Sequence, residues 1–194
     1  MICAIVPAAG ASRRMGTQKL LLPYAGTTVI GHVVDQLLAA ALDGVYVVVG
    51  HDAERVIAEL ARRAVHVVVN PDRDADMLSS VRCGLRALPP QCTAALVALG
   101  DQPSVTAGLV DRIVRAHAAT GRRIVVPTHN ARRGHPLLFS LAWRDEVLTR
   151  FDDLGLRGLL RAHGDDILDL PCDSPAVLSD VDTPEDYRRQ LDSL

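Results

Sequence analysis

Short apolar runs rich in β-branched residues alternate along the chain with longer segments whose apolar residues recur at helical spacing. The runs are apolar on both faces, which is typical of strands buried in a parallel sheet; they are Ile2–Val6, Val45–Val49, Val65–Val69, Ala94–Leu99 and Ile124–Val126. The segments between them predict amphipathic helices; they are Val29–Leu42, Ala53–Ala64, Ser79–Leu88 and Ala107–Ala119. This alternation predicts an α/β fold, a three-layer and mostly parallel doubly wound sheet with ligands at the carboxyl ends of its strands.

The rhythm changes after about residue 127. The pattern there predicts a polar turn, a short strand, two helices and a C-terminal helix with Thr183 as its N-cap; the segments are Thr128–Gly134, Pro136–Phe139, Trp143–Arg150, Leu156–His163 and Pro184–Leu191. No linker, repeat or low-complexity tract separates this half from the first. We therefore expect residues 1–194 to form a single domain, in which residues 128–180 elaborate the same sheet.

Composition narrows the classes of protein to consider. The chain has 194 residues, of which 48% are hydrophobic, and this apolar content excludes a disordered chain. The net charge of −2 argues against a general affinity for nucleic acid or for an anionic membrane surface. No apolar run approaches the ~18 residues of a membrane span. The four cysteines form no C-x-x-C pair, so we expect a reduced, cytoplasmic protein without a zinc site.

Lysine usage singles out one position. Lys19 is the only lysine among 21 basic residues. Codon bias in a GC-rich genome would explain the excess of arginine, because it replaces Lys by Arg wherever either residue serves. Lys19 would then mark a position where Arg does not serve, although a single Lys can also survive by chance. A tight phosphate site favours the compact ammonium of Lys over the planar fork of Arg.

Lys19 lies in an unusual loop, which follows the first expected strand and runs from Pro7 to Leu20. The loop is longer than the roughly 2–6 residues of an ordinary strand–helix connection. Small residues at positions 8–11 allow a ligand close to the backbone, and Arg13, Arg14 and Lys19 supply three cations. Backbone N–H groups with cations are how proteins hold polyphosphates, although a solvated basic loop is the alternative. The spacing matches neither a Walker P-loop nor G-x-G-x-x-G.

The loop also carries a family resemblance. The pattern A-A-G-x-S-x-R-M-G-x-x-K-L-L, met here at residues 8–21, resembles the MobA-like NTP-transferase family of molybdenum-cofactor nucleotidyltransferases. Further stretches resemble it in the expected order: Asn70-Pro71, Met77–Gly84, Leu99–Pro103, Arg133–Pro136 and Asp180–Asp186. The resemblance covers nearly the whole chain, and it implies a Rossmann-like fold of the nucleotide-diphospho-sugar transferase type.

The resemblance implies a reaction. Pro7-Ala8-Ala9-Gly10 is similar to the loop of the cytidylyl-transferring members, which move CMP from CTP to the terminal phosphate of molybdenum-loaded molybdopterin and release pyrophosphate. The alternatives are a guanylyltransferase that uses GTP, or a transferase for another phosphorylated acceptor. A third is a non-catalytic factor that binds the cofactor and delivers it. An apo-molybdoenzyme or its chaperone is a further partner that the resemblance implies.

The resemblance also implies roles for individual residues. Lys19, Arg14 and Asp101 are the candidate catalytic residues, and Asp101 and Asp182 are the candidate Mg²⁺ ligands, with Asp180 a weaker candidate. The nucleotide-binding candidates are Ala8, Ala9, Gly10, Ser12, Arg13, Lys19, Ser79, Ser80 and Gly84. The acceptor-binding candidates are His135 and Arg133, and residues 128–180 form the acceptor side.

Structural alternatives exist for three of these residues. Asp101 could cap the following helix, for which Thr106 is better placed, and Asp182 could be a partial N-cap beside Thr183. His135 could fix a turn by hydrogen bonding.

Overall fold

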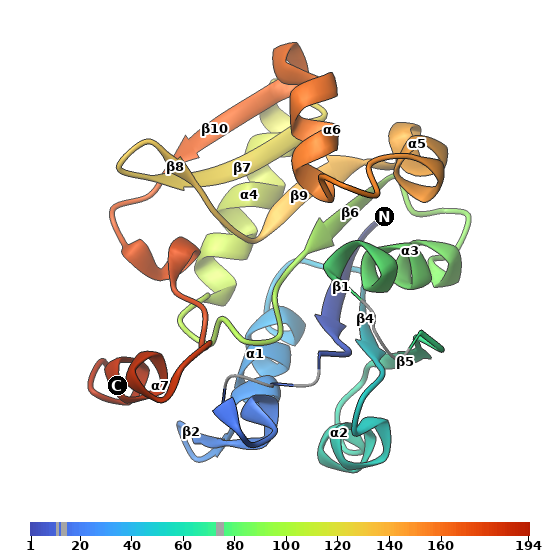
Figure 1. Cartoon of the computed structure of the whole chain (residues 1–194). Coiled ribbons are helices and arrows are strands. Elements are labelled where there is room, and N and C mark those ends of the chain that lie inside the picture. The colour runs from blue at the N-terminus through green and yellow to red at the C-terminus, as the bar shows by residue number, and fades with distance from the viewer. Residues whose placement is uncertain (11, 13–14, 73–75) are drawn as a thin grey trace.

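One mixed sheet of eight strands organises the structure, which is a computed structural model that describes residues 1–10, 12, 15–72 and 76–194 (Figure 1). Its strands, in the order β10-β7-β9-β6-β1-β4-β5 with β8 paired to β7, are β1 (Ile2–Ala8), β4 (Gly44–Val49), β5 (His66–Val69), β6 (Ala94–Val97), β7 (Ile124–His129), β8 (Arg132–Arg133), β9 (Leu137–Ser140) and β10 (Ile167–Pro171). All the apolar runs of the sequence are in this sheet.

The sheet is parallel except around β8 and β9. Strand β1 pairs in parallel with β4 and β6, β4 with β5, and β7 with β10. Strand β9 lies between β6 and β7 and runs antiparallel to both, with Leu137 opposite Val97 and Leu138 opposite Val125. Because β9 is reversed, its amino end lies at the same edge of the sheet as the carboxyl ends of β1 and β6.

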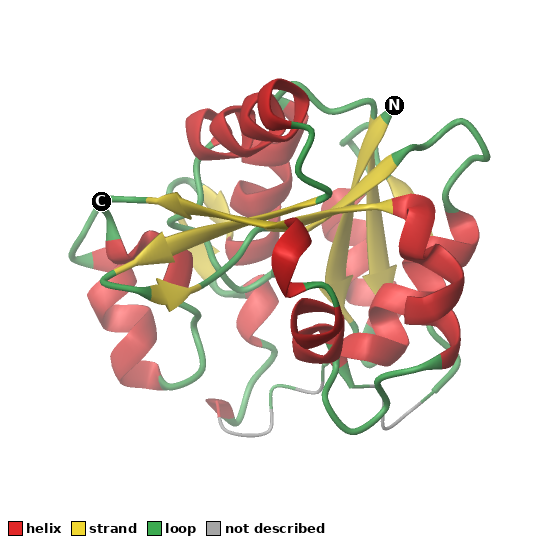
Figure 2. Cartoon of the chain, turned by 90° about the horizontal axis from the view of Figure 1, so that it is seen from above, coloured by secondary structure: helices red, strands yellow, loops and turns green. Residues whose placement is uncertain are grey.

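Helices cover both faces of the sheet, which confirms the expected three layers (Figure 2). Alternate residues of β1 point to opposite faces: Ala4 and Val6 to one core, Cys3 and Ile5 to the other. The first core contains apolar residues of α1 (Val29–Leu38), α2 (Ala53–Leu60) and α4 (Ala107–Thr120). The second contains those of α3 (Met77–Ala87), α5 (Arg144–Thr149) and α6 (Leu156–Ala162).

Smaller elements surround these layers. They are a hairpin of β2 (Pro23–Tyr24) and β3 (Thr27–Thr28), and the 3-10 helices η2 (Lys19–Leu21), η3 (Leu141–Trp143), η4 (Gly164–Asp166) and η5 (Pro175–Leu178). The C-terminal helix α7 (Pro184–Leu191) lies apart from the sheet, beside the β2 hairpin in Figure 1, where the Tyr187 hydroxyl donates to the Pro23 carbonyl. Among the described residues, no helix is long and apolar enough to cross a membrane.

The structure corrects two expectations and adds a strand. Strand β5 is not buried: it is the outer strand, and Val69 is 60% exposed. Residues 128–134 are not a plain turn, because Asn130 and Ala131, both at positive φ, join β7 to β8 in a hairpin. Strand β10 was not predicted from the sequence, because Asp169 interrupts its run of apolar residues.

Candidate active site

The loop after β1 begins in the hydrophobic core and reaches the protein surface at Gly10. Ala8 is part of β1 and is buried, and Ala9 is buried where the chain passes Gly50. A Cβ on Gly50 would fall 2.8 Å from the Cβ of Ala9, so a glycine is needed there for the close approach. Gly10 is exposed. A nucleotide could therefore reach the backbone of this segment at Gly10, whereas the side chains of Ala8 and Ala9 serve packing.

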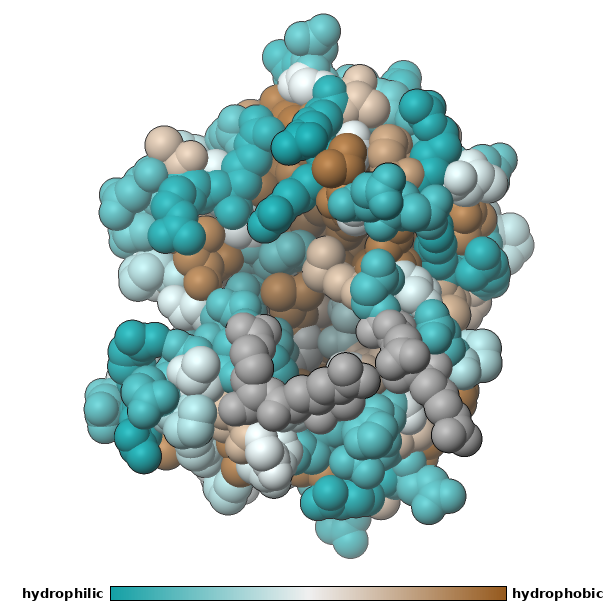
Figure 3. All heavy atoms as spheres, in the orientation of Figure 1, coloured by the Kyte–Doolittle hydropathy of each residue, from teal (hydrophilic) through white to brown (hydrophobic). Residues whose placement is uncertain are grey.

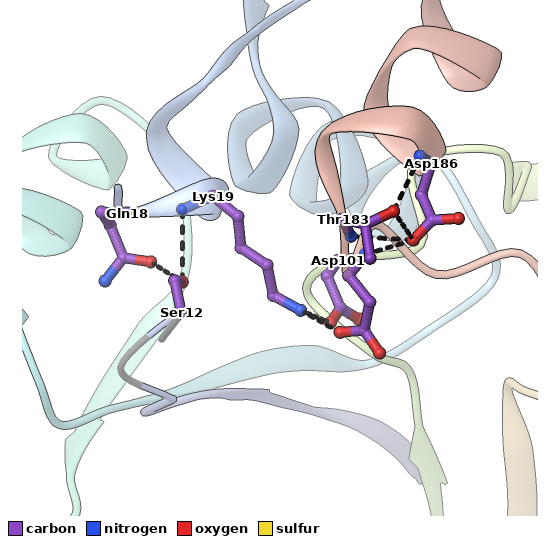
Figure 4. Close-up of polar contacts among 7 residues, drawn as sticks. Ser12, Gln18, Lys19, Asp101, Thr183 and Asp186 are labelled. Carbon is purple, nitrogen blue, oxygen red and sulfur yellow. Dashed lines mark hydrogen bonds and ion pairs between the residues drawn. The ribbon is translucent and has the colours of Figure 1, made fainter. Parts of the chain in front are cut away.

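Ser12 fixes the far end of the loop. Its hydroxyl donates to Oε1 of Gln18 at 2.9 Å and accepts from the backbone N–H of Lys19 at 3.2 Å (Figure 4). Leu20, the buried residue of η2, anchors the next position in the core. Ser12, a nucleotide-binding candidate, thus has an internal role, which is to hold the backbone of Lys19 in place.

The side chain of Lys19 joins two segments that are far apart in sequence. Its Nζ lies 2.5 Å from Oδ2 of Asp101 and 2.8 Å from Oδ1 of Asp182. Figure 4 shows the Lys19 side chain pointing toward Asp101. The side chains are 15%, 19% and 26% exposed, respectively. Burial alone would lower the pKa of Lys19, but the charges and hydrogen bonds of the two carboxylates outweigh it and raise that pKa above its ordinary value. Lys19 is therefore held as an ammonium ion.

Threonine hydroxyl groups cap the helices that follow Asp101 and Asp182. Thr106 accepts from the N–H of Leu109 and caps α4, so Asp101 is not the helix cap. Thr183 caps α7, as the sequence predicted, in a capping box with Asp186. Asp182 donates its backbone N–H to Asp186. The N-caps of α4 and α7 are thus Thr106 and Thr183 rather than Asp101 and Asp182.

Asp180 is a third carboxylate beside this pair. Burial raises its pKa, and the negative charges of Asp101 and Asp182 raise it further. Asp180 also borders a cavity of about 590 Å³ between α1, the turn after β6 and α7. Figure 3 shows one face of the molecule, which is hollowed near its centre.

Two serines at the start of α3 share one partner. The side-chain amide of Asn70 donates to the hydroxyl of Ser79 at 2.9 Å and lies 3.4 Å from that of Ser80. Asn70 itself is 4% exposed and follows β5 directly. Asn70 was part of the family pattern but had no assigned role; a buried amide that orients two hydroxyls is the role the structure gives it.

Gly84 has a packing role in the structure. It is buried in α3, and a Cβ on it would fall 2.5 Å from Cγ2 of Ile5 in β1. The glycine lets the helix approach the sheet, and a role of Gly84 in nucleotide binding stays a prediction.

The two acceptor-side candidates lie on different elements: His135 precedes β9, and Arg133 is in β8. The N–H of His135 donates to the carbonyl of Val177 at 2.9 Å, and its ring Nδ1 lies 3.4 Å from the carbonyl oxygen of Val97. Burial lowers the pKa of His135, so the ring is neutral at pH 7. Arg133 is exposed and makes two hydrogen bonds to the carboxylate of Asp169 in β10. His135 thus has turn-fixing contacts, while Arg133 is paired within the sheet.

Two of the candidates, Arg13 and Arg14, lie outside the described residues, and their roles stay predictions. Gln18 was missed by sequence reasoning. It is buried, and its Nε2 has no hydrogen-bond partner among the residues that the structure describes. No periodicity or spacing distinguishes such a glutamine from an ordinary loop residue.

Comparison with known proteins identifies the family. The model of the MobA-like NTP transferase domain matches residues 4–167, which include most of β1, the Lys19 loop, Asp101 and His135. The chain belongs to the MobA-like NTP transferase family.

Relatives of this NTP transferase carry different names. The chain is 31% identical to the nicotine blue oxidoreductase of Paenarthrobacter nicotinovorans, over 98% of this chain and 96% of that protein. It is 25% identical to the molybdenum cofactor cytidylyltransferase of Escherichia coli, over 96% and 93%. The crystal structure of Rv0371c from Mycobacterium tuberculosis superposes with a TM-score of 0.89 at 34% identity and covers both chains fully. Another structure of that protein is a complex with manganese.

The donor set of this NTP transferase suits a divalent cation. Oxygens of Asp101 and Asp182 converge on one positive atom, the Lys19 Nζ. Mg²⁺ takes hard oxygen ligands and is commonly held by one or two carboxylates together with substrate phosphates. No group of three or more His, Cys, Asp or Glu suited to a metal occurs within residues 1–10, 12, 15–72 and 76–194. The residues therefore fit a metal that arrives with a phosphate-bearing substrate better than a metal bound by protein alone.

Proposed function

We propose that this chain transfers CMP from CTP to the terminal phosphate of a molybdopterin-type acceptor and releases pyrophosphate. The observation that carries nucleotidyl transfer is the convergence of Asp101, Asp182 and Lys19 at the carboxyl-end edge of the sheet. Two carboxylates and an ammonium ion are the groups that a triphosphate and its cation require. The choice of CTP rests on the Pro7-Ala8-Ala9-Gly10 loop and on the relative named for cytidylyl transfer.

In this mechanism a terminal phosphate oxygen of the acceptor attacks the α-phosphorus of CTP. The bond from that phosphorus to the oxygen bridging the β-phosphate breaks, and pyrophosphate leaves with its electron pair. The nucleophile is already an anion, so no general base is needed. Positioning and charge neutralisation supply the catalysis.

The residues divide these tasks. Asp101 and Asp182 would hold Mg²⁺, which when bound neutralises charge on the phosphate oxygens. The ammonium of Lys19 and the guanidinium of Arg14 would bind oxygens of the triphosphate and stabilise the negative charge that grows on the leaving group. The Gly10 backbone, Arg13 and the Ser79 and Ser80 hydroxyls would contact the nucleotide, and neutral His135 and Arg133 the acceptor.

Pyrophosphate release tests this proposal. The protein is incubated with Mg²⁺, molybdenum-loaded molybdopterin and each of the four NTPs in turn. Release with CTP alone is the expected result. Release with GTP would assign the guanylyl reaction instead, and release only with a different phosphorylated acceptor would change the acceptor. Tight binding of the pterin product without turnover of any NTP would favour a delivery factor for an apo-molybdoenzyme or its chaperone.

Oxidoreduction is a second candidate function, because the relative that is 31% identical over nearly the whole chain is named an oxidoreductase. The carboxylate–ammonium cluster favours the transferase, since hydride transfer needs no such group. Substrate-dependent consumption of NADH or NADPH, without pyrophosphate release from any NTP, would favour the redox function.

A further inference from the structure

The contact between Lys19 and the two carboxylates has a consequence for how a metal ion binds. Oxygens of Asp101 and Asp182 lie 2.5 and 2.8 Å from the same ammonium nitrogen. A magnesium ion needs oxygen ligands at about 2.0–2.1 Å in near-ideal octahedral geometry. An ammonium ion between those oxygens takes the place of such an ion and repels it. Lys19 and a divalent cation therefore compete for the same pair of carboxylates.

The ammonium can leave without rearrangement of the loop. Hydrogen bonding to Ser12 and burial of the neighbouring Leu20 hold the backbone of Lys19, and these contacts involve no atom of its side chain. Lysine carries its charge on a flexible four-carbon stem, so the ammonium can swing while Cα stays in place. The motion needs a second anion to receive the charge, because a partly buried ammonium without a partner is costly.

We propose that Lys19 is a resident counter-cation, which blocks the Asp101–Asp182 pair in the free protein and moves to a triphosphate when nucleotide and metal enter together. This inference rests on the proposed role of the two carboxylates as metal ligands, and it depends neither on CTP as the nucleotide nor on the acceptor. In the free protein the Lys19 ammonium occupies the two carboxylates, so the affinity for a metal ion is low. Nucleotide binding removes the ammonium and thereby raises the affinity for the metal ion. Removal of a residue that assists catalysis should then strengthen the binding of the metal.

Binding of Mn²⁺, followed by electron paramagnetic resonance without nucleotide or acceptor, tests this inference. We expect Lys19→Met, which keeps the stem and removes the charge, to bind Mn²⁺ about tenfold to a hundredfold more tightly than the wild-type protein. The matched control is Arg188→Met, which removes one exposed positive charge on α7 and should change the affinity less than about twofold. Lys19→Met combined with Asp101→Asn should lose the gain. Equal or weaker Mn²⁺ binding by Lys19→Met would overturn the proposal.

A second measurement uses the wild-type protein and covers the case in which Lys19→Met does not fold. Because Lys19 is the only lysine, a ¹H–¹⁵N spectrum of lysine ammonium groups contains a single Nζ signal. Mg²⁺ and CTP are added together, and calorimetry follows metal binding in parallel. Metal binding should shift the Nζ signal, because the ammonium leaves the carboxylates. Saturation with metal while the Lys19 signal stays unchanged would contradict the proposal. Neither experiment measures turnover, and the Mn²⁺ experiment uses no nucleotide, so its outcome stays interpretable if the CTP reaction fails.

Discussion

The carbonyl oxygen of Asp101 accepts a hydrogen bond of 2.9 Å from the backbone N–H of Val181. Val181 is fully buried, so this bond fixes the turn after β6 to the segment that leads into α7. The side chains of Asp101 and Asp182 then converge on Lys19 because their backbones are tied together, and not only because opposite charges attract. The fold of the backbone therefore helps to assemble the site.

Loss of either carboxylate should abolish most of the transferase activity. We expect Asp101→Asn and Asp182→Asn each to lower kcat by about 10²–10³, the loss typical of removing one preorganised electrostatic group. Steady-state pyrophosphate release measures the effect. Asp152→Asn is the control, because Asp152 is 72% exposed and pairs with Arg82. Full turnover by Asp101→Asn would refute its place in the mechanism.

The serines of α3 should act on nucleotide binding through Asn70. Asn70→Ala leaves the two hydroxyls unoriented, and we expect KM for the nucleotide to rise about threefold to tenfold with a smaller change in kcat. Ser79→Ala should raise KM in the same direction. If KM stays constant in both variants while only the thermal midpoint falls, Asn70 is structural and the serines do not contact the nucleotide.

Close packing at Gly84 makes a stability prediction. Gly84→Ala forces a methyl group against Ile5, so we expect it to lower the free energy of unfolding by about 1–3 kcal/mol. Gly164→Ala is the matched control, since a Cβ there meets no atom within 4 Å. Denaturant unfolding compares the two variants. A Gly84→Ala protein as stable as Gly164→Ala would show that α3 shifts away from the sheet at little cost.

The capping box of α7 should make stability depend on acidity. Hydrogen bonds from Thr183 lower the pKa of Asp186 below its ordinary value of 3.8, and Arg189 adds to the effect. A carboxylate with a depressed folded-state pKa stabilises the fold above that ordinary value, and the contribution disappears as the pH falls through the folded-state pKa. Asp186→Asn should therefore flatten the loss of stability below about pH 4. An unchanged acid slope in thermal melts would contradict this assignment.

Removal of the cap itself should affect both stability and activity. Thr183→Ala should cost about 1 kcal/mol of stability. It should also lower kcat, because Asp182 precedes the cap directly and donates its N–H to Asp186. Thermal melts and pyrophosphate release measure the two effects, and Ser174→Ala, which removes the cap of η5, serves as the comparison.

Periodicity and local motifs predicted the buried strands, the helices and Thr183, because each depends on residues near in sequence. The reversal of β9 was not predictable, since its apolar run has the same composition in either direction. The contact of Lys19 with Asp101 and Asp182 spans 82 and 163 positions, and no local pattern encodes it. The packing role of Gly84 was likewise not predictable, because a Cβ there would meet Ile5, which is 79 positions away in the sequence.

Because β9 is antiparallel to β6 and β7, its start lies at the same edge of the sheet as the carboxyl ends of β1 and β6. The candidate site lies at this edge. Ala8 ends β1, Asp101 follows β6 and His135 precedes β9, so these candidate residues lie at one edge of the sheet. The turns at the opposite edge, such as Pro89–Pro90 between α3 and β6, carry none of these residues. Pro90 is exposed, so reporter groups or extra residues could be inserted after it. Such an insertion would lie a full strand length from the candidate site. This turn is therefore the natural attachment point for a sensor of nucleotide binding.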